Sequence, residues 1–187
     1  MEQVKACMDE MGFKYHIDAE RSVLGSGFVT ENYKDEDGEH HLRVVIRLDE
    51  DGEYLALFAP KTYVCRPDHP SARAVFETAA RMQYCRKLIC WEYDPRDGEV
   101  RASVSLPLED SQLTSRQFHR CLHGLISLVD DSYGQFRHAL ETGTCLDGDP
   151  GLKADRRSPA PASAGAHPRP RSGNRRRATP TAIGLAE

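Results

Sequence analysis

The 187-residue sequence lacks the signals that mark exported and membrane proteins. Its first residues show no basic segment followed by an apolar run, and no stretch approaches the roughly eighteen consecutive apolar residues that a membrane helix needs. The six cysteines form no C-x-x-C pair, so neither a disulfide framework nor a zinc cage is predicted. We therefore expect a cytoplasmic protein with reduced thiols and no membrane association.

Signatures of catalysis are also missing. The chain has no G-x-S-x-G, no phosphate-binding glycine loop and no H-E-x-x-H. His119 and His123 lie one helical turn apart with Cys121 between them, but no third metal ligand can be identified from the spacing. A Cys–His nucleophile could use Cys85, Cys90 or Cys121, although such cysteines mostly serve packing. We expect no enzyme, no catalytic residues, no metal and no cofactor. A thiol or metal enzyme around Cys121 is the weakest of three hypotheses.

The net charge of −4 hides an asymmetry between two parts of the chain. From residue 150 onward there are 8 basic and 2 acidic residues, which leaves 17 basic and 27 acidic residues before it, a net of −10. The same end holds six of the eleven prolines and no Val, Phe, Tyr or Trp, so it cannot bury enough apolar surface to fold. The sequence predicts a folded domain over 1–146 and a disordered, basic, Pro/Ala/Arg-rich tail over 147–187.

Hydrophobic periodicity within the domain predicts an α+β fold. Apolar residues at helical spacing indicate helices over 2–12, 71–85 and 114–143, the last opening with a Thr114–Gln117 capping box. Residues rich in β-branched and aromatic side chains indicate strands over 22–33, 41–48 and 53–59 and a hairpin formed by 87–94 and 99–108. We expect a helix, a three-stranded antiparallel meander, a helix, a β-hairpin and a long C-terminal helix.

The tripeptide Asp-Gly-Glu occurs three times, in KDEDGEH, LDEDGEY and DPRDGEV. A calcium loop would need D-x-[DN]-x-[DN]-G, and here Gly directly follows the second Asp. A four-residue hairpin loop instead needs a last residue with positive φ, which Gly38, Gly52 and Gly98 would provide. We interpret all three as turns.

The turns also predict which strand residues face each other. The last hairpin would set Tyr93 opposite Val100 and Glu92 opposite Arg101. The meander loops would pair Arg47 with Tyr54 and Arg43 with Phe58, and would place Phe28 beside Val45. The outer face would then carry an apolar patch among arginines. Its predicted partner-binding residues are Phe28, Val45, Tyr54, Phe58, Arg43 and Arg47. Cover by the first helix or by a second copy in a homodimer is the alternative to peptide binding.

The stretch ICWEYDPRDGEVRASVSLPLEDSQLTSRQFHRCLHGLISLVDD, in this order of elements, resembles the YbjN-like family of bacterial proteins. The matching features are the aromatic strand Ile89–Tyr93, the Asp97-Gly98 turn, the strand Val100–Leu106, the Leu113-Thr114 helix start and the Val129-Asp130 segment. The resemblance covers roughly residues 1–143. It implies a fold like that of the small chaperones of type III secretion, binding of peptides or proteins, or a role in sensory-transduction regulation, and no catalytic residues.

Two functional hypotheses follow from these observations. The leading one is a non-catalytic peptide- or protein-binding module, chaperone-like or regulatory, that uses one face of its antiparallel sheet. The alternative is a nucleic-acid-associated regulator that acts through RPRSGNRRR in the tail, because clustered arginines displace counterions from phosphates. A solvated linker is the favoured interpretation of that tail.

Overall fold

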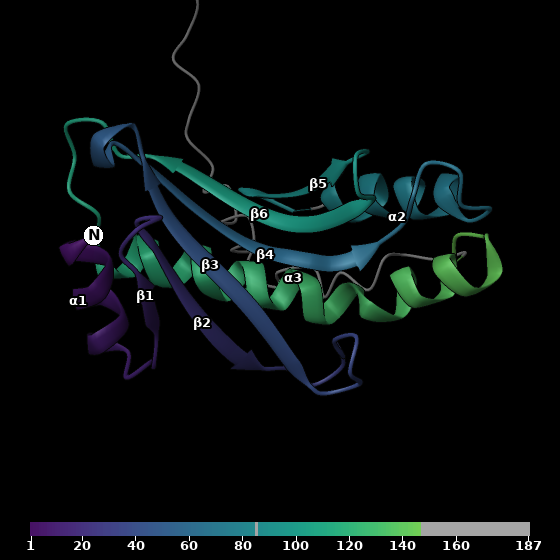
Figure 1. The fold of residues 1–187 in the computed structure, drawn as a ribbon, viewed down its shortest axis with the longest axis horizontal. Helices are drawn as coiled ribbons and strands as arrows, with labels where there is room; N and C mark the ends of the chain where they lie inside the picture. Colours follow the sequence, from purple (N-terminus) through teal and green to yellow (C-terminus); the bar gives the residue numbers. More distant parts are fainter. Residues whose placement is uncertain (85, 147–187) are drawn as a thin grey trace, which may run out of the picture. The chain divides into compact units, whose positions relative to one another are not determined.

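The computed structural model describes residues 1–84 and 86–146, and the tail predicted over 147–187 lies outside these ranges (Figure 1). The chain forms α1 (Glu2–Glu10), β1 (His16–Asp18), β2 (Val23–Val29), β3 (His41–Asp49), the 3-10 turn η1 (Glu50–Gly52) and β4 (Tyr54–Val64). It continues through α2 (Ala72–Tyr84), β5 (Ile89–Asp94), β6 (Glu99–Pro107) and α3 (Ser115–Thr142). This order confirms the predicted α+β class, and β1 is a strand that the sequence analysis missed.

The strands of the described chain form one antiparallel sheet in the order β1-β2-β3-β4-β6-β5. Because β6 pairs with β4, the hairpin returns to the meander and leaves β5 at the edge. The strand predicted to end at Ala59 continues to Val64 through a bulge between Ala59 and Tyr63. Pro60 lies in this bulge, where the absence of a proline N–H costs no ladder hydrogen bond.

The helices gather on one face of this sheet and enclose the core. Cross-strand neighbours on that face, such as Ile46, Leu57 and Val104, are at most 1% exposed. The apolar stripe of α3 meets them with Phe118, Leu122, Leu125, Val129 and Phe136, all buried. Figure 1 shows α3 running along the sheet, with α1 near its first turns and α2 near its last. The predicted capping box at Thr114 is present and fixes where α3 begins.

The three Asp-Gly segments are turns, as predicted. Gly38, Gly52 and Gly98 have φ of 84°, 101° and 78°, which side chains other than glycine rarely adopt. In two of the turns an aspartate side chain bonds the backbone, since Asp35 accepts the amides of Asp37 and Glu39, and Asp97 accepts the amide of Glu99. Bonds of this kind are one reason why aspartate is frequent in turns.

The strand pairing predicted from the turns holds in one hairpin and fails in the other. In β5–β6 the pairs Tyr93–Val100 and Glu92–Arg101 occur as predicted. In β3–β4 the pairing is displaced by two residues, so that Val45 lies opposite Phe58 and Arg47 opposite Ala56. The predicted pairs Arg47–Tyr54 and Arg43–Phe58 were therefore wrong, although each residue keeps its face. The cause is η1, where Glu50, Asp51 and Gly52 all have positive φ and move the turn toward β4.

The pairing of β2 with β3 differs from the prediction by an odd number of residues, which exchanges the two faces of β2. Phe28 lies opposite Leu42, is 8% exposed and points into the core, whereas Val29 points outward and is 87% exposed. The connection is not a tight hairpin, because Asp130 of α3 accepts hydrogen bonds from the amides of residues 31, 32 and 33 at 2.8–3.1 Å. The loop is thus tethered to a helix about one hundred residues away.

Candidate protein-binding face

The face of the sheet opposite the helices has Phe58 at its centre. Phe58 lies on β4 between Val45 of β3 and Ser103 of β6, and its ring is half-buried. The helices pack against the other face, so in the described part of the chain only neighbouring side chains cover this ring. We call Val45, Phe58 and the arginines around them the Phe58 cluster.

Two guanidinium groups flank the ring of Phe58. The Cζ atom of Arg101 lies 4.7 Å from the ring centroid and that of Arg47 lies 5.8 Å from it. Carboxylates hold both arginines, since Arg47 pairs with Asp49 and Arg101 with Glu92, each at 2.7 Å. The aromatic ring therefore lies within a rim of cations that are already oriented.

The predicted site residues have four different environments. Tyr54 and Phe58 are half-buried on the outer face, as expected, and Arg43 and Arg47 are exposed there. Val45 faces outward but is only 9% exposed, because the side chains beside it cover it. Phe28 does not belong to the site. It lies on the core face, where its ring meets that of Phe13 edge to face, with 5.2 Å between centroids.

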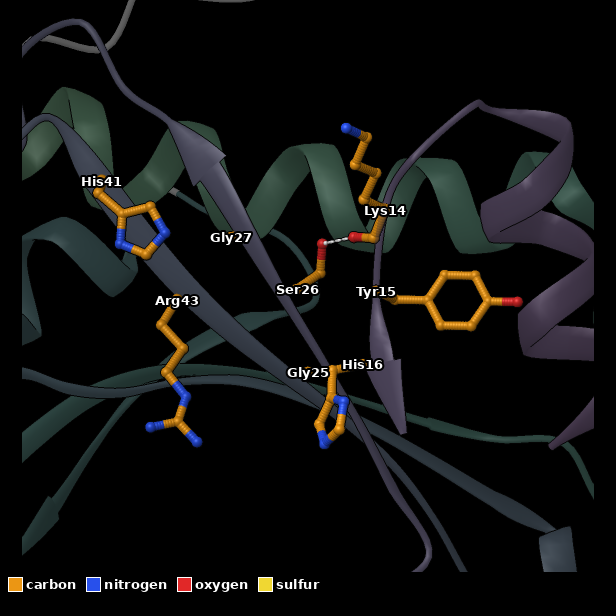
Figure 2. A pocket seen from close by; sticks show the side chains of 8 residues that line it. All are labelled: Lys14, Tyr15, His16, Gly25, Ser26, Gly27, His41 and Arg43. Atoms are coloured by element: carbon orange, nitrogen blue, oxygen red, sulfur yellow. Dashed lines mark hydrogen bonds between the residues drawn. The ribbon is translucent and has the colours of Figure 1, made fainter. Parts of the chain in front are cut away.

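A hollow of about 430 Å³ adjoins the cluster over β2. Its floor is Gly25 and Gly27, which face outward and have no side chain, and we call it the glycine trough (Figure 2). His16 of β1 lies opposite Gly25, and Arg43 of β3 lies opposite Gly27. A Cβ atom on Gly25 would meet nothing within 4 Å, so the trough is open above it.

His41 and Lys14 also line the trough. The imidazole of His41 lies across Gly27, and its Nε2 atom would clash with a Cβ atom at that position. Figure 2 shows the side chain of Lys14 pointing away from Arg43 and His16, while its backbone carbonyl accepts the hydroxyl of Ser26 at 2.7 Å. Arg43 and His16 thus lie on the same side of the trough, next to Gly25, and the side chain of Lys14 points away from them.

The candidate thiol and metal residues on α3 do not converge. Cys121 is buried, and burial raises the pKa of its thiol, which is the opposite of nucleophile activation. His119 and His123 are exposed and stack on each other, with 5.7 Å between ring centroids. Within residues 1–84 and 86–146, no three His, Cys, Asp or Glu side chains gather closely enough to hold a metal ion. Cys85 lies outside the described residues.

Three important residues of this face escaped the sequence analysis. Arg101 was assigned only to its pair with Glu92, because its approach to Phe58 depends on β6 lying beside β4. Gly25 and His16 could not be connected while β1 was missing. The signal that was available is the pair of glycines in VLGSGFV, since glycine inside a strand often marks close approach by another molecule.

Two solved complexes resemble this chain at low sequence identity. Among the described residues, no helix is long and apolar enough to span a bilayer. No family model and no curated protein matches the sequence, so the resemblance to the YbjN-like family stays a prediction. Among solved structures, the HopA1–SchA chaperone–effector complex matches with a TM-score of 0.46 and 12% identity, over 68% of this chain and 88% of that one. The ExsC–ExsE complex matches with a TM-score of 0.45 and 17% identity, over 73% and 90%.

Proposed function

We propose that this protein is a non-catalytic module that binds extended segments of partner proteins through the outer face of its sheet. The observation that carries the proposal is the Phe58 ring, held between two guanidinium groups on a face that no helix of the described residues covers. Aromatic and arginine side chains supply most of the energy at protein interfaces, and polar groups around them exclude water. The Phe58 cluster has this composition and arrangement.

The neighbouring residues Phe58 and Leu57 allow a matched test, because they point to opposite faces of β4. Leu57 is fully buried in the core. Changing it to Ser should cost about 3 kcal/mol or more of unfolding free energy, since it removes buried apolar atoms and introduces a hydroxyl. Phe58→Ser should cost about 1 kcal/mol, because the ring is already partly in water. Urea denaturation measures both.

The binding test uses an array of decapeptides of varied composition, probed with the full chain. The parent should bind a subset of the peptides, and Phe58→Ser should lose them while keeping its fold. If Phe58→Ser unfolds the protein as badly as Leu57→Ser, the cluster is structural and the proposal fails. If the parent binds no peptide and Phe58→Ser instead turns a dimer into a monomer in light scattering, the face contacts a second copy.

A further inference from the structure

The glycine trough indicates which chemical class of side chain the partner presents. We propose that it receives an acidic side chain of the partner's extended segment, with Arg43 as its main contact and Gly25 as its floor. This inference rests on the proposed function, because the trough continues the Phe58 cluster. Gly25, Val45 and Phe58 are direct cross-strand neighbours on β2, β3 and β4.

The guanidinium group of Arg43 gives the trough a positive charge. Arg47 and Arg101, on the same face, are paired with carboxylates of this chain. Arg43 makes no ion pair with any described residue, and it is exposed beside the trough. Of the arginines on this face of the sheet, Arg43 is therefore the one whose charge no carboxylate of the described residues offsets. A guanidinium group favours a carboxylate, which it can bind with two hydrogen bonds.

Gly25 leaves open space above the strand. A side chain at this position would lie between His16 and Val45, its neighbours on β1 and β3. Glycine leaves this position empty, although its backbone lacks the positive φ that would require glycine. Glycine inside a strand lowers stability, and here no turn or close internal contact explains it. An incoming side chain can therefore reach the backbone between Arg43 and His16.

No carboxylate is among the described residues that line the trough. Asp35 lies 3.8 Å from Nδ1 of His41, the imidazole that covers Gly27. The basic side chains among the lining residues, with Arg43 foremost, attract an anion. Val45 and Phe58 next to it suit an apolar residue of the same segment. The complementary ligand is therefore an extended peptide in which acidic and apolar residues alternate.

The experiment measures fluorescence anisotropy of a fluorescein-labelled octapeptide of alternating glutamate and valine, with a lysine–valine octapeptide as comparison. The full chain should bind the glutamate peptide and not the lysine peptide. Arg43→Gln should weaken binding by roughly tenfold or more, because a charge-assisted pair is lost. Gly25→Val should do the same by filling the trough, with an unchanged or higher melting temperature, because valine suits a strand and its Cβ atom would meet nothing within 4 Å.

Arg116→Gln is the matched control. It removes the same charge from an exposed arginine of α3, the helix that packs on the opposite face of the sheet, so affinity should change by no more than about twofold. Equal binding by the parent, Arg43→Gln and Gly25→Val would overturn the inference and place the acidic peptide elsewhere, for example on the basic residues after 150. If Phe58→Ser loses peptides that the two trough variants keep, the proposed function stands and only the acidic partner is refuted.

Discussion

At the scale of single residues, Gly98 shows two independent reasons for one glycine. Its φ of 78° disfavours any side chain, and a Cβ there would lie 2.9 Å from the backbone of Cys65 and Arg66. The contact is close because the Gly98 carbonyl accepts the amide of Cys65 at 2.8 Å. The turn that joins β5 to β6 therefore also holds the end of β4.

We predict that Gly98→Val lowers the free energy of unfolding by about 3 kcal/mol or more, since backbone strain and the clash add. Gly38→Val is the control, because Gly38 has a similar φ of 84° with nothing within 4 Å of its Cβ position. It should cost about 1 to 2 kcal/mol, from strain alone. Urea denaturation compares the two variants. Equal losses would show that the contact with Cys65 and Arg66 contributes nothing.

At the scale of elements, the β2–β3 connection depends on Asp130 of α3. One carboxylate oxygen accepts the amides of residues 31, 32 and 33, and the other accepts the side-chain amide of Asn32. Hydrogen bonds to a charged acceptor are among the stronger ones. This carboxylate fixes the connection that sets the faces of β2.

Asp130→Ala should therefore cost about 2 to 4 kcal/mol of stability and speed hydrogen exchange at amides 31–33. Asp131→Ala is the neighbouring control. It removes a surface ion pair with Arg86, of 3.0 Å, and should cost about 1 kcal/mol or less. If amides 31–33 stay as protected in Asp130→Ala as in the parent, the carboxylate does not hold the loop.

The same elements show what a sequence can and cannot predict. The β5–β6 register follows from a local rule, since a four-residue loop ending in Gly98 leaves a single pairing. The β2–β3 connection is longer than a four-residue loop and is bonded by Asp130, about one hundred residues away, and no local pattern reports that contact. The strand β1 has three residues, too few for a pattern, and forms because β2 offers an edge. The sequence predicted part of the Phe58 cluster, because its strands were recognised. The strand order that places β6 beside β4, and so brings Arg101 to the ring, was not predicted.

At the scale of the whole molecule, buried tyrosines link stability to alkaline pH. Burial raises the pKa of Tyr33 to about 12, and burial also raises the pKa of Tyr63 well above its usual value. A tyrosine is neutral when protonated, so the folded state keeps a proton that the unfolded chain loses near pH 10. The stability from Tyr33 is thus complete below about pH 10 and is lost as the pH rises toward 12.

We predict that the urea midpoint of the parent falls steeply between pH 10 and 12, and that Tyr33→Phe falls less steeply. The variant also loses the hydrogen bond from the Tyr33 hydroxyl to the Thr62 carbonyl, of 3.2 Å. The comparison therefore concerns the slope with pH, and each protein serves as its own reference at pH 8. Identical slopes would show that the ionisation of Tyr33 does not contribute to alkaline unfolding.

The position of α3 in the chain has a consequence for synthesis. The helix covers the core face of a sheet whose strands all precede it, and it supplies Phe118, Leu125 and Phe136 to the core. A ribosome that makes this chain releases the whole sheet before the helix that covers it. Until residue 142 emerges, Leu24, Ile46, Leu57 and Val104 have no complete cover. The nascent chain is therefore most open to proteases and to aggregation in the interval just before its last helix is made.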